Sequence, residues 1–396
     1  MKTYRLCELG ELKNGLNFEK RNIINPCKII GVGDFANNVY PNYEKLATIE
    51  RKLVSNDFFL KEDDIVFVRS NGNKTLVGRT MLIKDIQEEI TYSGFCIRFR
   101  VNCKDVYPEY LFYALRSPYC RKQYSYSQQT NITNLSQGIL GNVIVKLPSL
   151  SEQKRIARIL SNIDKKIMNN LKINDNLEQQ LQILFDYWFK QFDFPNENNE
   201  PYKCSGGKMY WDSVYKRNIP IGWEILKFDD LVATPPKTPS IMAPDYKNIG
   251  LYPIIDQASS YITGRTDDIF YVYPNEDDCV VFGDVTKVFK YINFPFAKGT
   301  DGTKIIRSIN NRIPALILYY LIKDAKLPNK GFARYYSLLR EIYVLVPSSD
   351  VSEKFIVATK PIVSKIRANL EENYKLQNTR DWLLPMLMNG QATIDD

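Results

Sequence analysis

Two stretches of the chain, residues 152–191 and 351–388, repeat apolar residues every three or four positions. This spacing places the apolar side chains on one face of an α-helix, so each stretch is predicted to form one long helix with a core-facing stripe. Ser151 is the expected N-cap of the first helix, and Glu152 suits the positive end of its dipole. The two stripes consist of Ile156, Leu160, Ile163, Ile167, Leu171, Leu177, Leu181, Leu184 and Trp188, and of Ile362, Ile366, Leu370, Leu376, Leu383 and Leu387.

One polar residue falls on each stripe, Asn174 in the first and Asn373 in the second, at equivalent places. A lone asparagine at a core position commonly fixes the register and partner number of a coiled coil. We therefore expect the two helices to pack antiparallel with these asparagines near the middle. The alternative is that both asparagines face solvent on a slightly rotated stripe. Pro361 is expected to kink the second helix or mark its start, and Pro385 to do the same near its end.

The rest of the chain forms two blocks in which β-branched and aromatic runs alternate with Gly, Asn and Asp, as is typical of strand-rich α+β modules. The blocks also resemble each other in sequence and in order, which predicts a tandem duplication. The matching segments are 4–12 with 223–231, 65–67 with 280–282, 108–115 with 314–321, and 143–148 with 342–347.

The expected fold class is therefore α+β, with two strand-rich domains in tandem, each followed by a long helix, and with the two helices packed as an antiparallel coiled coil. Segment 193–220 is polar, punctuated by Gly and Pro, and aperiodic, so it is predicted to link the two repeats. The predicted parts are residues 1–150, 151–192, 193–220, 221–348 and 349–390.

The formal charge of +8 is unevenly distributed along the chain. Residues 1–148 contain 21 Lys and Arg against 15 Asp and Glu, and residues 202–345 contain 19 against 15, whereas 149–201 and 346–396 are each slightly acidic. The two basic blocks would attract a polyanion. The alternative is that the small excess of positive charge serves only solubility.

The sequence also suggests a cytoplasmic protein. The first residues, MKTYRLCELGEL, lack the apolar run of a signal peptide, and no stretch approaches the ~18 apolar residues of a membrane span. The cysteines are seven in number, without a Cys-x-x-Cys pair. They are therefore interpreted as isolated buried thiols rather than as disulfides or zinc ligands.

Familiar catalytic chemistry is not indicated. The chain has no histidine, which excludes Ser-His-Asp and Cys-His catalysis and histidine-ligated zinc. Neither a Gly-x-x-x-x-Gly-Lys-Ser/Thr phosphate loop nor a Gly-x-Gly-x-x-Gly turn occurs. The acidic run 276–278 could bind Mg²⁺, but we interpret it as a solvated turn. We therefore expect no catalytic residue, no metal site and no cofactor in this chain.

Several polar loops are candidates for DNA contact, because Arg, Lys, Asn, Gln, Ser and Thr supply the hydrogen bonds that base edges and phosphates accept. For each loop taken singly, an ordinary solvated turn remains the alternative. The candidate residues in the first block are Lys20, Arg21, Arg69, Asn71, Lys74, Tyr126, Gln128, Gln129, Thr130 and Asn131. Those in the second block are Lys237, Thr238, Gln257, Lys287, Thr303, Lys304, Lys330 and Arg334.

Three segments together resemble the specificity subunit of type I restriction-modification systems. They are PSLSEQKRIA at 148–157, LEQQLQILFDYWF at 177–189 and IPIGWEILKFDDL at 219–231. A looser second copy of the first motif lies at 347–358, where Lys354 and the two residues after it replace Gln-Lys-Arg. The terminal RDWLLP at 380–385 is similar to the closing segment of the family. The resemblance covers essentially the whole chain.

The resemblance implies a non-catalytic subunit that reads a bipartite, asymmetric DNA site with two target recognition domains, using the helices as a ruler. It also implies two methylation subunits and restriction subunits as partners on double-stranded DNA, with S-adenosylmethionine, ATP and Mg²⁺ belonging to those partners. Alternatives are a specificity subunit of a related restriction-modification or defence system, a coiled-coil adaptor with incidental nucleic-acid binding, and a sequence-independent nucleic-acid binder.

Overall fold

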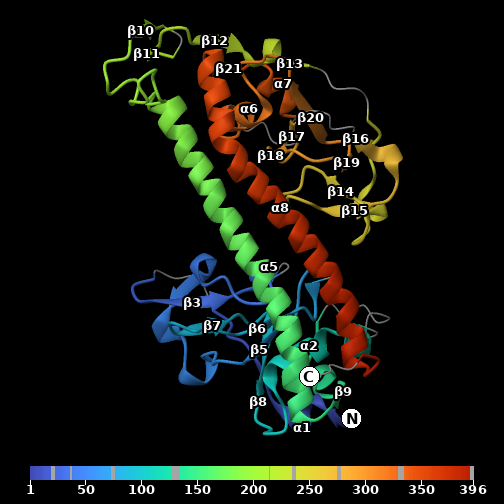
Figure 1. Ribbon diagram of the computed structural model, residues 1–396. Helices are drawn as coiled ribbons and strands as arrows, with labels where there is room; N and C mark the ends of the chain where they lie inside the picture. Colours follow the sequence, from blue (N-terminus) through green and yellow to red (C-terminus); the bar gives the residue numbers. More distant parts are fainter. Residues whose placement is uncertain are drawn as a thin grey trace. The chain divides into compact units, whose positions relative to one another are not determined.

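The computed structural model describes residues 1–18, 23–35, 38–72, 76–125, 134–213, 215–233, 238–273, 278–328 and 334–392. The chain divides into two compact units (Figure 1). Unit 1 combines Met1–Asn169 with Glu372–Asp396, and unit 2 comprises Asn170–Glu371. Each unit therefore contains one strand-rich domain together with parts of both long helices.

Unit 1 contains two sheets and one short strand pair. The four-stranded antiparallel sheet has the order β2-β8-β5-β6, from β2 (Gly10–Asn14), β8 (Cys96–Val101), β5 (Ile65–Val68) and β6 (Thr80–Leu82). The three-stranded sheet has the order β4-β3-β7, from β4 (Ala47–Glu50), β3 (Pro26–Ile30) and β7 (Ile90–Tyr92), and β3 runs parallel to β7. The strand pair joins β1 (Lys2–Arg5) to β9 (Ile144–Leu147).

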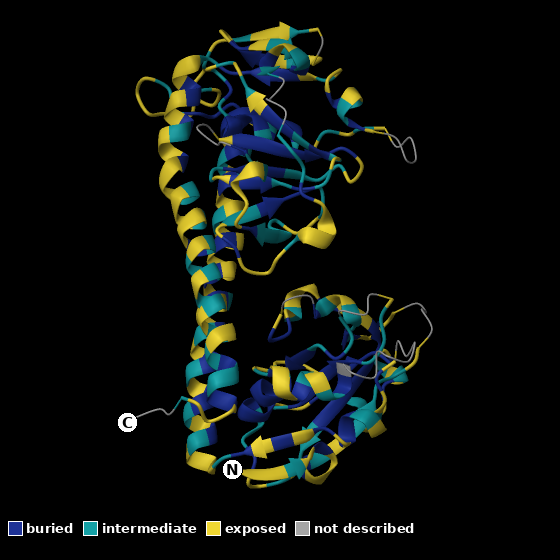
Figure 2. Cartoon of the chain, turned by 90° about the vertical axis from the view of Figure 1, so that its right-hand side faces the viewer, coloured by how far each residue is buried: buried dark blue, intermediate teal, exposed yellow. Residues whose placement is uncertain are grey.

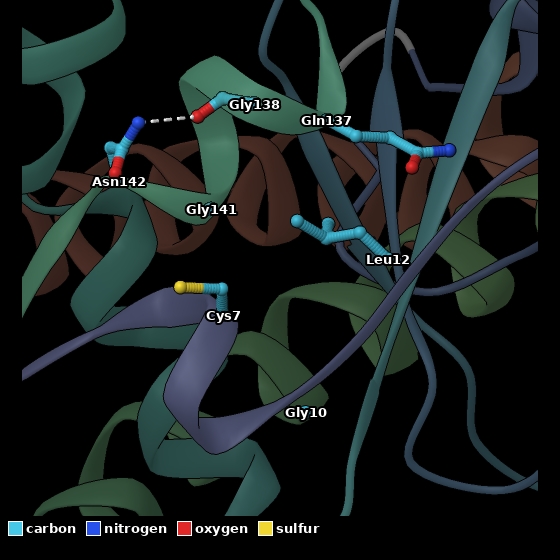
Figure 3. Close-up of a pocket in the computed structure, with 7 residues that line it drawn as sticks. All are labelled: Cys7, Gly10, Leu12, Gln137, Gly138, Gly141 and Asn142. Atoms are coloured by element: carbon cyan, nitrogen blue, oxygen red, sulfur yellow. Dashed lines mark hydrogen bonds between the residues drawn. The ribbon is translucent and has the colours of Figure 1, made fainter.

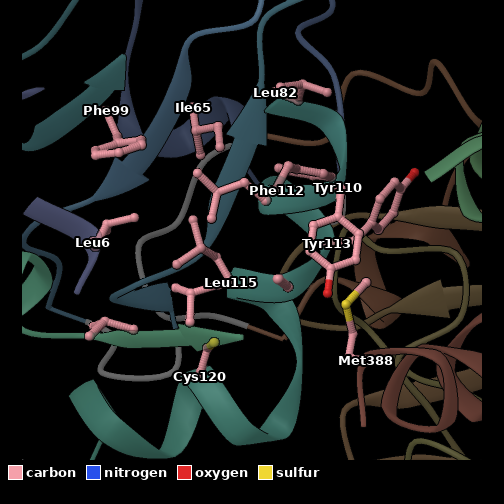
Figure 4. Close-up of a cluster of buried hydrophobic side chains, with 14 of the residues drawn as sticks. Leu6, Ile65, Leu82, Phe99, Tyr110, Phe112, Tyr113, Leu115, Cys120 and Met388 are labelled. Carbon is pink, nitrogen blue, oxygen red and sulfur yellow. The ribbon is translucent and has the colours of Figure 1, made fainter. Parts of the chain in front are cut away.

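Helix α2 (Pro108–Arg116) packs against the four-stranded sheet and forms the main core of unit 1 (Figure 4). Leu6, Phe99 and Leu115 are fully buried there, and Met388 from the end of the last helix joins the same cluster. The other short helices are α1 (Leu6–Leu9), α3 (Pro118–Ser125) and α4 (Gln137–Gly141), with 3₁₀ turns at Val32–Asp34, Tyr43–Lys45, Arg51–Leu53 and Asn56–Phe58.

Unit 2 repeats this plan. Its antiparallel sheet has the order β13-β20-β17-β18, from β13 (Val232–Ala233), β20 (Thr303–Ser308), β17 (Cys279–Gly283) and β18 (Phe289–Ile292). Its second sheet has the order β15-β14-β19-β16, from β15 (Gly264–Thr266), β14 (Tyr252–Ile255), β19 (Phe296–Lys298) and β16 (Val272–Tyr273), and again holds one parallel pair, β14 with β19. The strand pair is β12 (Glu224–Lys227) with β21 (Tyr343–Val346).

The helices of unit 2 also correspond to those of unit 1. α6 (Ala315–Ile322) takes the place of α2 and α7 (Tyr336–Leu339) that of α4, with 3₁₀ turns at Phe228–Leu231, Ala243–Asp245 and Ile269–Tyr271. The central strands of the four-stranded antiparallel sheets, such as β5 and β17, are buried, whereas the long helices carry exposed residues along their length (Figure 2). The matching order of strands, parallel pairs and helices supports the predicted tandem duplication.

The two predicted long helices are α5 (Leu150–Phe185), which continues as a π-helix at Asp186–Lys190, and α8 (Ser349–Met388). The expected cap at Ser151 is wrong: the Ser149 hydroxyl accepts a hydrogen bond from the Glu152 amide at 3.3 Å, and Ser151 lies inside the first turn. α8 begins at Ser349, so Pro361 does not mark its start.

The helices pack antiparallel in each unit. In unit 1, the Arg380 guanidinium donates a 2.6 Å hydrogen bond to buried Asp164, and the Asn373 amide donates to the Ile167 carbonyl at 3.4 Å. In unit 2, the Asn174 amide donates to the Ile366 carbonyl at 3.4 Å. Partner numbers on α8 fall as numbers on α5 rise, which confirms the predicted antiparallel coiled coil and the α+β fold class.

Both stripe asparagines are buried, each 5% exposed, so the solvent-facing alternative is wrong. Two further asparagines, Asn170 and Asn369, are buried at 1% and were not predicted. In unit 2 the Asn369 amide donates to the Asn174 side-chain oxygen at 2.8 Å. Part of the central seam is therefore a polar pair rather than a leucine layer.

Segment 193–220 is more than a connector. It contains a hairpin of β10 (Met209–Asp212) and β11 (Arg217–Pro220), and it places Phe194 and Ile219 in the core of unit 2. The Phe194 ring stacks on Tyr202 and Trp223, with ring centroids 4.6 and 5.5 Å apart. The segment thus belongs structurally to unit 2, while the predicted division of the chain at its boundaries stays a prediction.

The cysteines are free, as predicted, but they are not all buried. Cys27, Cys96, Cys120 and Cys279 are buried, Cys103 is half-buried, and Cys7 and Cys204 are exposed. Burial raises the pKa of Cys96 and of Cys279 to about 12, which keeps these thiols protonated. Across the described part of the chain, no helix combines the length and apolar character that a bilayer crossing requires.

Candidate nucleic-acid interface

Described segments that flank the candidate residues of unit 1 lie close to one another. Lys20, Arg21, Lys74, Tyr126, Gln128, Gln129, Thr130 and Asn131 fall outside the described residues, as do Lys237 and Lys330 of unit 2. The described flanks of those loops, residues 16–17, 69–72 and 134–135, contact one another or the turn 93–95 between β7 and β8. We call these four segments the unit 1 loop cluster.

Backbone hydrogen bonds fix the unit 1 loop cluster. The Arg69 amide donates to the Phe95 carbonyl at 2.8 Å, and the Leu135 amide donates to the Arg69 carbonyl at 2.8 Å. On the other side of the turn, the Gly94 amide donates to the Leu16 carbonyl at 2.8 Å. A Cβ on Gly94 would lie 1.9 Å from the Asn17 side-chain oxygen, so any larger residue there would have to displace the Asn17 side chain. These backbone hydrogen bonds therefore hold the four segments together.

Arg69 and Asn71 are half-buried in this cluster, and the Arg69 guanidinium donates to the Gly94 carbonyl at 3.4 Å. Two further arginines lie beside it that the sequence analysis missed. Arg121 in α3 donates to the Gly78 carbonyl at 3.1 Å, and burial, together with the Arg121 charge, lowers the pKa of Arg79. Their positions, just after 69–74 and just before 126–131, were the signal that could have found them.

The candidate loops of unit 2 also converge. Segments 256–257, 284–288, 299–304 and 334–336 contact one another, and we call them the unit 2 loop cluster. The Thr286 hydroxyl donates to the Gln257 carbonyl at 2.5 Å. Thr238 lies at the margin, where the Lys298 ammonium donates to its carbonyl at 3.4 Å.

Asp284 organises the unit 2 loop cluster. This residue is 2% exposed, and its carboxylate accepts a 2.8 Å hydrogen bond from the Tyr336 amide. Its other carboxylate oxygen lies 3.8 Å from the Lys304 ammonium. Because a buried carboxylate needs such partners, Asp284 ties Lys304 to the start of α7.

The exposure of the remaining candidates differs. Arg334 is exposed, and the Lys287 ammonium lies 4.1 Å from the centroid of the Tyr335 ring. Thr303 departs from the expectation of an exposed loop residue: it begins β20 and is 1% exposed, because its side chain points into the domain. Lys287 has a φ of 59°, so the turn that carries it adopts the left-handed backbone conformation, which is uncommon for a residue other than glycine.

The two loop clusters occupy the same topological position. In unit 1 the residue that follows β5, Arg69, bonds the 93–95 turn and Leu135. In unit 2 the residue that follows β17, Asp284, bonds in the same way: its amide donates to the Gly302 carbonyl at 2.8 Å and its carbonyl accepts from the Tyr335 amide at 2.9 Å. Equivalent backbone hydrogen bonds thus occur in both units, but the side chains at these positions differ.

Unit 1 also has a shallow pocket of about 370 Å³ between α1 and α4 (Figure 3). Its lining consists of Cys7, Gly10, Leu12, Gln137, Gly138, Gly141 and Asn142, and it contains no acidic or basic side chain. Within the described ranges, no group of three or more His, Cys, Asp or Glu residues could hold a metal ion. The loop clusters remain the best candidate site.

Comparison with known proteins agrees with this geometry. Residues 1–179 match the Methylase_S family, described as the type I restriction modification DNA specificity domain. This part of the chain is therefore similar to a type I restriction modification DNA specificity domain. The predicted resemblance to specificity subunits is confirmed by relatives that extend beyond this domain.

One relative of this chain is the type I restriction enzyme MjaIX specificity subunit of Methanocaldococcus jannaschii, which is 24% identical over 74% of this chain and 70% of that protein. Another is the HindI specificity subunit of Haemophilus influenzae, 23% identical over 91% of this chain and 93% of that protein. The crystal structure of the type I S subunit from M. genitalium covers 98% of this chain and 95% of its own, with 15% identity and a TM-score of 0.50. That likeness supports the fold.

Proposed function

We propose that this chain is the non-catalytic subunit that gives a type I restriction-modification enzyme its DNA specificity. Its two domains act as target recognition domains, each reading one half of a bipartite, asymmetric site. The observation that carries the proposal is the loop cluster built twice, at equivalent places and with different side chains. One frame with two sets of polar and basic groups suits two different half-sites.

The chemistry of the loop clusters favours DNA. Guanidinium and amide groups such as those of Arg69, Asn71 and Gln257 can form paired hydrogen bonds with base edges, and ammonium groups such as that of Lys287 suit phosphates. The slightly acidic segments 149–201 and 346–396 would not attract a polyanion. Contact is thus expected at two separate places on the duplex.

The long helices supply the spacing in this proposal. α5 has 36 residues and α8 has 40, which correspond to about 54 and 60 Å of helix. Readers held by such helices would meet DNA about one helical turn apart, roughly 34 Å, or further. The helices also offer surfaces for the partners, which we propose to be two methylation subunits and the restriction subunits. S-adenosylmethionine, ATP and Mg²⁺ would bind those partners.

The test is a footprint of the full chain, with and without a methylation subunit, on DNA that contains the methylated sites of the host genome. The expected result is protection of two half-sites with an unprotected gap. Arg69→Ala should weaken the first half-site and Lys287→Ala the second. Lys61→Ala and Lys203→Ala are matched controls, because both side chains are exposed and lie outside the loop clusters.

Only salt-sensitive, sequence-blind binding would contradict the proposal and favour a general nucleic-acid binder. Absence of DNA binding with retained binding of a methylation subunit would favour the adaptor alternative.

A further inference from the structure

A buried lysine lies directly behind the unit 2 loop cluster. Lys290 in β18 pairs with Val281 of β17 and is 4% exposed. Its ammonium donates hydrogen bonds to the Asp256 carbonyl at 2.8 Å and to the Ser260 carbonyl at 2.5 Å. Burial of an ammonium is unfavourable unless such partners satisfy it. The two bonds therefore join both ends of the turn 256–260 to the sheet.

The turn 256–260 contains Gln257, one of the candidate DNA contacts, and is fixed from other sides as well. The Asp256 carboxylate accepts from the Ala258 amide at 2.9 Å and from the Tyr246 hydroxyl at 3.2 Å. The Thr286 hydroxyl holds the Gln257 carbonyl. Lys290 thus completes a set of contacts that leaves the backbone around Gln257 little freedom.

Unit 1 uses the corresponding position differently. Val66 of β5, the counterpart of Val281, pairs with Met81 of β6 and with Arg98 of β8. Met81 therefore takes the place of Lys290 and is fully buried among apolar residues. The buried cation of unit 1 is instead Arg98, which is 2% exposed and donates to the Asp57 carbonyl at 3.1 Å. The repeat shows that the fold accepts methionine at the position of Lys290.

We propose that Lys290 is a positioning residue for sequence reading by the second domain. By holding both ends of the turn 256–260, it fixes the direction in which Gln257 meets the bases. Because Met81 occupies the equivalent place, the first domain lacks this anchor, and the two half-sites are read by differently supported loops. This inference rests on the proposed function.

Lys290→Met, the residue that the other repeat carries, is the direct test in the full chain with its methylation subunits. DNA binding is measured on duplexes with single base changes in either half-site. The expected result is a loss of about tenfold or more in discrimination at the second half-site, the range of one well-read base pair. Discrimination at the first half-site should be unchanged in the same molecule.

Amide hydrogen exchange of residues 256–260 is the second readout, and it needs no DNA. Exchange there should be faster in Lys290→Met, while β17 stays protected. Lys227→Met is the matched control, because Lys227 lies in β12 and pairs with Glu341 at 2.8 Å. Lys290→Gln, which keeps an N–H donor, should give an intermediate result in both readouts.

Unchanged exchange of the turn, or unchanged discrimination at the second half-site, would overturn the proposal. Equal loss at both half-sites would do so too, as would unfolding of the second domain in both variants, because Lys290 would then support the domain and not the turn. If the unaltered chain reads no sequence but the turn loosens in Lys290→Met, the proposed function fails while the structural role of Lys290 stands.

Discussion

The asparagine pair in the helix seam of unit 2 gives a prediction that can be worked out in free energies. Asn174 is 5% exposed and Asn369 is 1% exposed, and the two side chains share a 2.8 Å hydrogen bond. Replacing Asn174 alone by Leu gains about 1.5–3 kcal/mol of apolar burial. It also leaves the buried Asn369 amide without this partner, which costs about 1–3 kcal/mol. The single change should therefore be close to neutral.

Replacing both asparagines by Leu removes the unsatisfied group and should stabilise the pair by about 2–4 kcal/mol. The coupling between the two positions should then be about 2 kcal/mol, within the range of directly contacting residues. The double variant should also tolerate DNA sites whose gap differs by one base pair, because the polar pair no longer fixes register.

Native-state hydrogen exchange of α5 and α8 is the suitable assay, since a chain with two units lacks a single unfolding free energy. Asn176→Leu is the matched control: Asn176 is exposed on the same helix, and its change should stay within about 0.5 kcal/mol. If Asn174→Leu alone stabilised the helices as much as the double variant, the coupling argument would be refuted.

Four further outcomes are expected. Lengthening both α5 and α8 by one or two turns should widen the gap between the half-sites and leave both half-sites unchanged; altered half-sites would show that the helices do not act as a ruler. Arg380→Ala should destabilise unit 1 by about 3–5 kcal/mol, because it removes the partner of a carboxylate that is 2% exposed; a melting temperature within two degrees of the unaltered chain would disprove this. Ser149→Ala should cost about 1 kcal/mol of helix stability and Ser151→Ala less than about 0.5 kcal/mol, and the reverse order in thermal melts would restore Ser151 as the cap. Burial lowers the pKa of Lys290 to about 8, against about 10.4 in an unfolded chain, so the folded state binds fewer protons between these values and stability should rise with pH there relative to Lys290→Met; parallel pH profiles of the two melting curves would rule this out.

The helices were predictable because their periodicity is a property of neighbouring residues. The cap was missed by two residues, since a cap is defined by which hydroxyl reaches a free amide, and the Ser149 hydroxyl reaches Glu152. Asn369 was missed because the stripe of one helix does not reveal which partner residue faces Asn174. The cap depends on which of two nearby hydroxyls reaches the free amide, and the asparagine pair depends on a contact between residues that are far apart in the chain.

The loops were found from their composition, but their convergence was not predictable from it. Arg69 and the turn at Gly94 meet only because β5 and β8 are neighbours in the sheet. Lys290 could not have been identified, because strand alternation assigns a lysine to solvent, whereas β18 lies in a sheet whose second face is also covered. A buried lysine in such a strand can be recognised only once the structure shows the carbonyl groups that accept its hydrogen bonds.

The terminal strand pairs have an evolutionary consequence. In β1 and β9, Lys2 lies opposite Leu147, and in β12 and β21, Glu224 lies opposite Val346. Each domain therefore begins and ends at adjoining points, which is the geometry that tolerates insertion of foreign sequence. A gene segment for one such domain could be exchanged for another allele whose ends form the same strand pair, provided that the new domain also packs against the helix residues, such as Met388, that complete the core.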